Sequence, residues 1–511
     1  MLCYVIALCL IGACAAARVL VVFPVPDREH SELGNAVVRT LLAGDHEVTY
    51  VSVFPKKTSN SNLTYVDISS ILTQQSAKEL PNDKQVSSNG QPAHFVLKSG
   101  PRYAKNALQH EAIRQLIHDP STAFDAVVVD WFYSGLLAPL ASLFECPLIW
   151  YVHGDASGRS LALLHEQPGA AYSVDPLSGH VPAVPFTAKD RAYGLGLQAY
   201  YNLWAYYIEH FIEIPAYDAI FRTPMQLRKR LLPNYEDVVY NGSLLLVNSN
   251  PPLGQTLPLP QNVKLVGGHH IREPIPPLAK SLQAFMDNTK KGVILINLGN
   301  LQRNLPHQLK TQMLDALSQL EYLVLWQLED PVEYVPKNIR LLDRAPQLGI
   351  LCHPNTVLFV TDGSLSSLME ATHCGVPFVA VPSSGEQNVN VDLLVGRLLG
   401  RKVQINKYLP WTLQGTIEKV LRDPNYGRNM KQASAVFKSR IQPPTSELLY
   451  WVNLVIETRG ATHLLSPAVT MPALERYHAD LWVLFFLFLW FLSKVVKVAQ
   501  VHLKDMEKKN K

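Results

Sequence analysis

Short apolar runs alternate with longer segments of helical period along most of this chain. In the first half the runs occupy residues 18–23, 47–53, 126–129, 147–152 and 244–247. In the second half they occupy residues 292–298, 322–326, 357–361 and 378–381. Apolar runs this short are typical of strands buried on both faces, and the segments between them predict crossover helices. The alternation therefore predicts an α/β protein with parallel, doubly wound sheets.

A proline-rich stretch separates the two series of strands. It runs from Pro251 to Pro277, and such a composition is typical of a linker rather than a core. We therefore predict two α/β domains, residues 18–250 and 291–440, joined by a linker over 251–290 and facing a cleft. Residues 194–221, rich in Tyr, Leu and Ile, fit either a core-facing helix or an amphipathic helix near a ligand pocket or a membrane, and the first is commoner.

Both ends of the chain are apolar. Residues 2–13 are almost wholly apolar and small residues precede Arg18, which predicts a secretory signal peptide over 1–17. Residues 481–493 form an unbroken apolar run, which spans about 20 Å as a helix against about 30 Å of hydrocarbon. Lys494 and Lys497 can extend the buried length by snorkelling. We predict a transmembrane region over 477–500, preceded by a closing helix and connector over 441–476; a buried core helix fits the basic residues that follow less well.

Charge sets the orientation of this membrane span. Of the net charge of +4, much lies in the tail 501–511, which the positive-inside rule places in the cytosol, with the body in the lumen. The sequons at Asn62 and Asn241 suit a luminal body. The terminal Lys508, Lys509 and Lys511 resemble a dilysine retrieval signal of the endoplasmic reticulum, or form an ordinary juxtamembrane tail. No basic patch interleaved with aromatic residues is present, which argues against a nucleic-acid partner.

Cysteine usage predicts no covalent framework. Three of the six cysteines lie in the signal peptide, and Cys146, Cys352 and Cys374 remain, far apart in mostly apolar surroundings. We expect buried thiols there rather than disulfides. No cluster of His, Cys or acidic residues has the spacing of metal ligands, so no metal site is predicted.

Candidate chemistry gathers where predicted strands end. His30 follows the first strand, and Asp130 closes the strand over 126–129, so both belong at the carboxyl edge of one sheet. Imidazole titrates near neutrality and suits a general base, and a carboxylate would orient it. His153, after the next strand, either lines a pocket or lies on the surface, and the surface is the commoner place for it.

A second candidate site lies in the C-terminal half. The strand over 357–361 turns at Gly363 into a helix over 365–372, followed by an apolar run over 377–381 and a polar loop with Glu386 and Gln387. A strand, turn and helix of this kind present a helix N-terminus to an anion.

The spacing from Phe359 to Asn390 resembles the signature of the UDP-glycosyltransferases, particularly the animal and insect-type enzymes. Five further segments resemble the same family: residues 23–30, 242–253, 266–271, 346–354 and 451–464. The resemblance implies a GT-B fold of two Rossmann-like domains, with the acceptor on the N-terminal domain and the UDP-sugar on the C-terminal one. A homo-oligomer is left open.

The resemblance also implies roles for individual residues. His30 would be the base and Asp130 its partner in a direct, inverting displacement without metal or cofactor, the UDP-sugar being a co-substrate. Gln347 would meet the uracil or ribose, Glu370 the ribose hydroxyls, and Glu386 with Gln387 the sugar. The full set of implied donor-binding residues is Gly299, Asn300, Arg344, Gln347, Asp362, Gly363, Ser364, Ser367, Glu370, Glu386 and Gln387.

Several of these positions depart from the family pattern. Asp362 replaces a His that donates to the pyrophosphate, Ser364 replaces a Gly, and Arg344 replaces a Trp that stacks on uracil. Asn297 and Asn300 stand where small hydroxyl residues are common, and Glu386 replaces Asp.

Two readings follow. The first is an active transferase of the endoplasmic reticulum membrane that moves glucose or glucuronic acid to a hydroxyl of a small lipophilic acceptor. The second is a pseudo-glycosyltransferase that acts as a membrane-held binding or partner protein. His30 and Asp130 favour the first, because a binder needs no base, whereas Asp362 favours the second.

Overall fold

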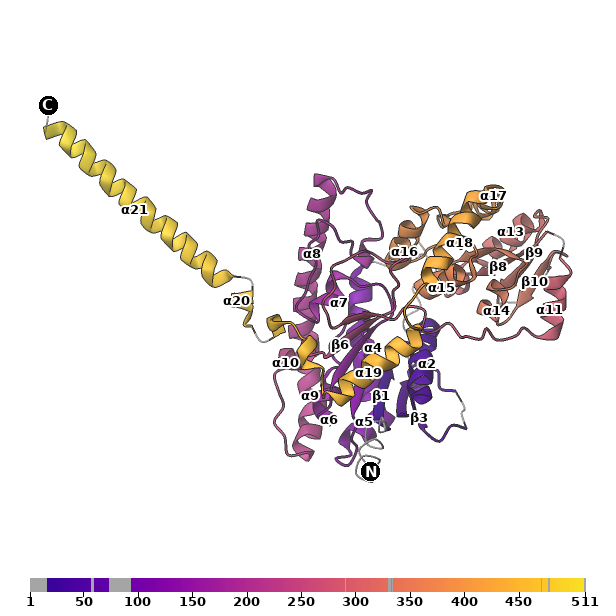
Figure 1. Ribbon diagram of the computed structural model, residues 1–511, viewed down its shortest axis with the longest axis horizontal. Coiled ribbons are helices and arrows are strands. Elements are labelled where there is room, and N and C mark those ends of the chain that lie inside the picture. The colour runs from indigo at the N-terminus through magenta and orange to yellow at the C-terminus, as the bar shows by residue number, and fades with distance from the viewer. Residues whose placement is uncertain are drawn as a thin grey trace, which may run out of the picture. The chain divides into compact units, whose positions relative to one another are not determined.

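The computed structural model describes residues 16–56, 59–72, 93–289, 291–329, 332, 334–469, 471–476 and 478–509 (Figure 1). The chain divides into two compact units after Leu464. The predicted signal peptide lies almost wholly outside the described residues. So do Asn510, Lys511 and the side chains of residues 503–509, which bear on the dilysine prediction.

The first sheet of the larger unit has seven parallel strands in the order β3-β2-β1-β4-β5-β6-β7. Val22 on β1 pairs with Val129 on β4, so the loop after β1 and the end of β4 meet at one edge of the sheet. That edge is where ligands bind in doubly wound folds. The strands are β1 Arg18–Phe23, β2 Glu47–Ser52, β3 Leu63–Asp67, β4 Ala126–Asp130, β5 Leu148–Val152, β6 Leu244–Val247 and β7 Val263–Leu265.

Helices cover both faces of this sheet, because its strands are apolar on both sides. One of them, α19 (Pro444–Glu457), comes from the C-terminal end of the unit and packs Leu448, Val452 and Val455 into the core beneath β1. The remaining helices are α2 Arg28–Ala43, α4 Ala93–Gln109, α5 Glu111–His118, α6 Pro139–Phe144, α7 Gly158–Ala162, α8 Ala188–Ile208, α9 Ile214–Leu227 and α10 Tyr235–Val239.

The second sheet has six parallel strands in the order β10-β9-β8-β11-β12-β13. The strands are β8 Val293–Asn297, β9 Leu323–Gln327, β10 Ile339–Leu342, β11 Thr356–Thr361, β12 Phe378–Ala380 and β13 Gly400–Lys402. Its helices are α11 Lys280–Asp287, α12 Leu301–Asn304, α13 His307–Ser318, α14 Gln347–Leu351, α15 Leu365–Cys374, α16 Gly385–Val395, α17 Leu409–Arg422 and α18 Pro424–Lys438. Two parallel sheets of Rossmann type confirm the predicted fold class.

Every strand expected from an apolar run is present, but two expectations about other segments are wrong. The proline-rich stretch is not all linker, since β7 within it adds a seventh strand beside β6, with Val247 opposite Leu265. The segment 194–221 does not simply face the core. Its helix α8 and the π-helical turn after it leave Leu203 and Phe211 69% and 67% exposed.

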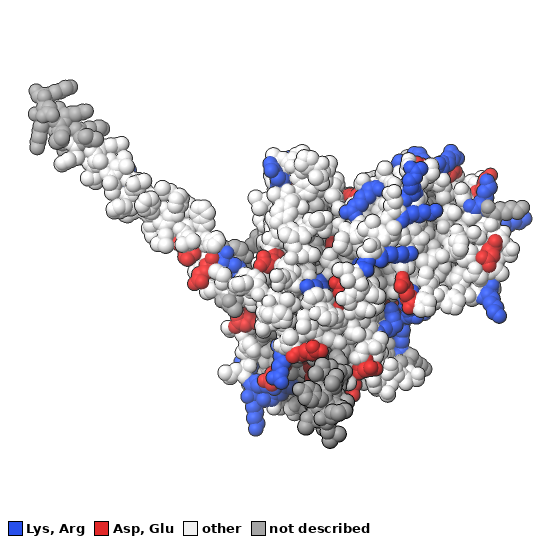
Figure 2. Space-filling model, in the orientation of Figure 1, with Lys and Arg blue, Asp and Glu red and all other residues white. Residues whose placement is uncertain are grey.

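The smaller unit contains α21 (Ala479–Lys509), of which residues 479–502 are long and apolar enough to cross a membrane. These 24 residues extend about 36 Å, which exceeds the hydrocarbon thickness of about 30 Å. The apolar run 481–493 alone is too short to span that thickness. On the face that Figure 2 shows, no charged side chain is visible along the described part of the helix beyond its first turn, and the helix also carries Lys494 and Lys497. The structure thus contains one candidate membrane span in the part of the chain that it describes.

The expectation of free cysteines is wrong for one pair. Cys352 follows α14 and Cys374 ends α15, and the two form a disulfide with their Cα atoms 4.7 Å apart. The two helices pack against each other, which the 22-residue separation does not reveal. Cys146 is a free thiol, and burial raises its pKa to about 12, so it is unreactive.

We expect the double substitution Cys352→Ser/Cys374→Ser to lower the free energy of unfolding by about 3 kcal/mol, because the bridge closes a loop of 22 residues. Urea denaturation under non-reducing conditions measures this loss. Cys146→Ser is the matched control and should change the urea midpoint little. An unchanged midpoint in the double variant would argue that the disulfide contributes nothing to stability.

Candidate functional site

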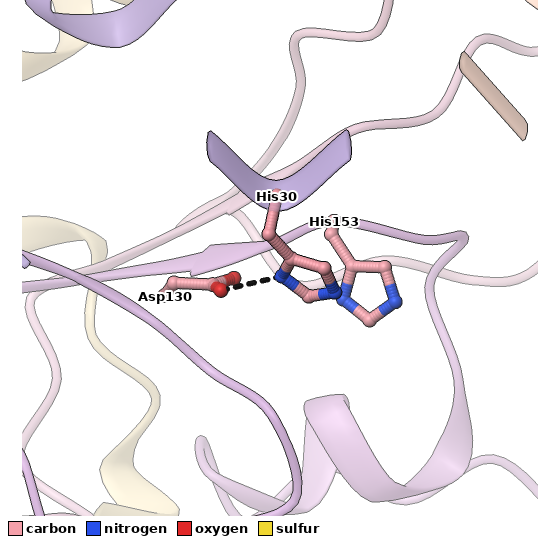
Figure 3. Close-up of side chains that lie close together, drawn as sticks. All are labelled: His30, Asp130 and His153. Atoms are coloured by element: carbon pink, nitrogen blue, oxygen red, sulfur yellow. Dashed lines mark hydrogen bonds and ion pairs between the residues drawn. The ribbon is translucent and has the colours of Figure 1, made fainter. Parts of the chain in front are cut away.

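The centre of the site is a buried pair of side chains, one from the helix that follows β1 and one from the end of the neighbouring strand β4. Asp27 caps α2 by accepting a hydrogen bond from the Glu29 amide, and this places His30 in the first turn of the helix. Asp130 is the last residue of β4. His30 Nδ1 lies 2.6 Å from Asp130 Oδ2, and the two residues are only 5% and 2% exposed (Figure 3). The fold thus brings together the two residues named as base and partner.

The electrostatics of the pair suit a base. Burial opposes protonation of His30, but the charge and hydrogen bond of Asp130, with Asp27 and Glu386, raise its pKa above the ordinary value. Since a carboxylate only accepts, Nδ1 donates to Asp130 and Nε2 is left to accept a proton. The second oxygen of Asp130 is buried and has no hydrogen-bond partner among the residues that the structure describes.

His153 lies inside the site and not on the surface, which corrects the favoured expectation. It follows β5, and its ring centre is 4.1 Å from that of His30 (Figure 3). Its Nε2 lies 3.3 Å from Glu386 Oε2. Ligand atoms of His30, Asp130 and His153 lie within 4.8 Å of one another, a grouping that sequence spacing did not indicate.

A cavity of about 330 Å³ adjoins His30 and is lined from both sheets. On the side formed by the first domain, Tyr103 and Phe132 line the cavity with aromatic rings, and the Phe132 ring centre is 5.4 Å from that of His30. Of the implied donor residues, those that line the cavity are Asn300, Asp362, Ser364, Glu386 and Gln387. The structure therefore places the base and part of the donor set around one space.

Glu386 and Gln387 begin α16, which Ser384 caps with a capping box. Burial opposes ionisation of Glu386, but His153 and His30 lower its pKa, so the carboxylate is charged. Its contact with His153 links the second domain to the first. A Cβ on Gly154 would collide with this carboxylate, so the glycine makes room for it. Gln387 accepts from the Ser383 amide at 2.8 Å and donates to Asp362 at 2.9 Å.

Asp362 closes β11 at the head of α15. Its Oδ1 accepts from the Ser364 amide at 3.1 Å, and Ser364 rather than Asp362 is the N-cap residue. Gly363 has φ +86° and Gly299 has φ +51°, and a Cβ on Gly299 would meet the Asp362 carboxylate. The amide at this helix start is thus already bound by the chain's own carboxylate.

A second group of implied donor residues forms its own hydrogen-bond cluster. Gln347 accepts from Asn297 at 2.6 Å and donates to Glu370 at 3.0 Å and Ser367 at 3.3 Å. Burial raises the pKa of Glu370 to about 7. Arg344 is exposed on the loop before Gln347 and does not line the cavity.

The sequence profile of the family described as UDP-glucoronosyl and UDP-glucosyl transferase matches residues 28–510. The chain belongs to this UDP-glycosyltransferase family. A UDP-glucosyltransferase 2 of Dactylopius coccus is 27% identical over 88% of this chain and 85% of its own. The human UDP-glucuronosyltransferase 3A1 is 30% identical over 49% of each chain.

The fold agrees with solved structures. A UDP-glucosyltransferase from Polygonum tinctorium, described as capable of glucosylating indoxyl, superposes with a TM-score of 0.58 at 17% identity, covering 87% of this chain and all of the other. At that identity the likeness shows the GT-B fold alone.

For a UDP-glycosyltransferase, the structure adds lining residues that sequence reasoning missed. Asp27 and Glu29 line the cavity beside His30, and with Asp362 they make one end of it acidic. Both residues lie within three positions of His30 in the sequence, and this proximity could have indicated that they belong to the site. Tyr103 and Phe132 were also missed, because nothing in the sequence shows that α4 reaches the end of β4. The sequon residues Asn62 and Asn241 are exposed, as glycosylation requires.

Proposed function

We propose that this UDP-glycosyltransferase moves a hexose from a UDP-sugar to a hydroxyl of a small lipophilic acceptor, with inversion at the anomeric carbon. The observation that carries the proposal is the 2.6 Å His30–Asp130 pair beside a cavity whose other wall holds Glu386 and Gln387. Tyr103 and Phe132 next to His30 suit an apolar acceptor.

The proposed reaction is a single displacement. The acceptor hydroxyl gives its proton to His30 Nε2 while its oxygen bonds to the anomeric carbon, and Asp130 stabilises the resulting imidazolium. The bond from that carbon to the diphosphate oxygen breaks, and UDP leaves with the electron pair. The configuration inverts because attack and departure occur on opposite faces. In this scheme His30, Asp130 and His153 do not serve as metal ligands, and the reaction proceeds without a metal ion.

Glucose is the better candidate than glucuronic acid. The described residues lining the cavity include no Lys or Arg, whereas Glu386 is ionised there. A glucuronate carboxylate placed against Glu386 would be repelled, but sugar hydroxyls can donate to it.

The candidate span at 479–502 and the basic tail support a single-pass protein of the endoplasmic reticulum with a luminal body.

One observation favours a second function, that of a binding protein which has lost its donor. Asp362 holds the Ser364 amide and brings negative charge to the head of α15, where a diphosphate is expected. A protein of this kind would bind the acceptor but not UDP.

One experiment distinguishes the transferase from the binding protein: full-length protein in nanodiscs is incubated with UDP-glucose and a panel of phenols and lipophilic alcohols. Mass spectrometry should detect a glucoside, equally with and without EDTA, and calorimetry should detect UDP binding. Product that disappears with EDTA would contradict the metal-free scheme. Absence of both product and millimolar UDP binding would overturn the transferase and favour the binding protein.

A further inference from the structure

The end of the cavity at the head of α15 has an unusual charge for a diphosphate site. Three carboxylates line it, Asp27 and Glu29 from the first domain and Asp362 from the second. Among the described residues of the lining, neither Lys nor Arg is present to offset them. A diphosphate entering here therefore needs hydrogen-bond donors, and at least one of these acids favours its neutral form.

The three carboxylates differ in how completely they are hydrogen bonded. Asp27 accepts from the Glu29 amide at 2.7 Å and from Asn300 Nδ2 at 2.5 Å. Asp362 accepts from the Ser364 amide and from Gln387, one on each oxygen. Both acids thus have two hydrogen-bond donors, although burial still raises the pKa of Asp362 above its ordinary value.

Glu29 is the exception. Its Oε1 accepts one long hydrogen bond, 3.4 Å from the Ser366 amide in the first turn of α15. The Ser366 side chain also hydrogen bonds to this carboxyl group, and Glu29, which is partly exposed, lines the cavity. This contact joins α2 to the helix start where a donor diphosphate is expected.

We propose that Glu29 is a further donor-binding residue, which meets the diphosphate as a neutral carboxylic acid and donates the hydrogen bond that Asp362 cannot. The oxygen that accepts from the Ser366 amide fixes the side chain at the head of α15, and the other oxygen carries the proton toward the ligand. The inference rests on the proposed function, because it assumes a UDP-sugar in this cavity.

The charges around Glu29 support this protonation state. Burial, then Asp27 and Asp362, raise its pKa to about 8, while the Ser366 hydrogen bond and His153 lower it less. His30, Tyr103 and Glu386 are the other titratable groups that line the cavity. Glu29 is therefore neutral at pH 7, and above pH 8 it becomes an anion that repels diphosphate. Diphosphate affinity should fall as pH rises through about 8.

Calorimetry of UDP and uridine binding at pH 7 and pH 9, with full-length protein in nanodiscs and EDTA, tests the proposal. The wild type should bind UDP about tenfold more weakly at pH 9, because the neutral fraction of a group with a pKa of about 8 falls about tenfold. The phosphate's own ionisation, near pH 6, lies below this window. Uridine, which lacks the diphosphate, should bind equally at both pH values.

Variants separate the role from the fold. Glu29→Gln keeps a donor and cannot ionise, so its UDP affinity should match the wild type at pH 7 and stay unchanged at pH 9. Glu29→Ala should lose affinity at pH 7 for UDP but not for uridine. Glu32→Gln, an exposed acid on the same helix, is the matched control and should keep the wild-type pH dependence.

The outcomes are distinguishable. UDP binding that is independent of pH in the wild type, or that falls equally at pH 9 in Glu29→Gln, overturns the role of Glu29 and leaves the transferase standing. UDP binding that requires added Mn²⁺ or Mg²⁺ also overturns it, since the carboxylates would then hold a cation. Failure of UDP to bind at either pH overturns both the inference and the proposed function.

Discussion

His30→Ala should lower kcat by about 10²- to 10⁴-fold, the usual contribution of a positioned general base. The same variant should bind UDP as the wild type does, because neither the uridine and diphosphate contacts implied for the second domain nor the one proposed for Glu29 involves His30. Product formation under saturating UDP-glucose and calorimetry with UDP measure the two effects. Asp130→Asn is the companion variant: it keeps the shape of the pair, removes the charge that stabilises imidazolium, and should also lower kcat.

The pH profile provides a second readout of the same role. The pKa of His30 is raised above 6.5, and the base acts only when neutral, so kcat/KM should rise with pH through a value above 6.5. The residual activity of His30→Ala should not show this rise of kcat/KM with pH. A kcat of His30→Ala equal to that of the wild type, or a pH dependence that survives the substitution, would assign the base to another group, with His153 the nearest candidate.

The fold was predictable because it depends on local patterns. Runs such as residues 18–23 and 126–129 are apolar on both faces, which only a covered parallel sheet accommodates, and they became β1 and β4. Four strands escaped prediction, and all four lie at the edges of the two sheets. Polar residues interrupt Leu63–Asp67 and Ile339–Leu342, and Val263–Leu265 and Gly400–Lys402 are only three residues long. An edge strand needs a neighbour to define it, and the neighbour is not visible in its own sequence.

The site was predictable only where residues belong to strand ends. His30 and Asp130 meet because β1 and β4 are adjacent, a consequence of the doubly wound order. The contact of His153 with Glu386 and that of Glu29 with Ser366 cross between domains, over 233 and 337 residues of chain. Such contacts depend on how the two domains pack, which no local pattern encodes. For the same reason the Cys352–Cys374 bridge was missed, since it depends on α14 lying against α15.

Asp362→His should tighten UDP binding by about tenfold or more. The substitution removes a buried carboxylate from the expected diphosphate site, and like charges about 4 Å apart repel by about 1 kcal/mol in water and about 4 near a protein surface. It also frees the Ser364 amide, which Asp362 now occupies, and adds a ring donor. Gly299 leaves room for the larger side chain, because it has no Cβ facing this position.

Asp362→Asn separates these effects, since it removes the charge without adding a ring. Calorimetry should give affinities in the order His, then Asn, then the wild-type Asp, with uridine binding equal in all three. The pH dependence assigned to Glu29 should also move to lower pH in both variants, because the charge of Asp362 is one cause of the raised pKa of Glu29. Equal or weaker UDP binding in Asp362→His, with an unchanged thermal midpoint, would contradict the repulsion argument. It would mean that this transferase binds its donor diphosphate away from the head of α15.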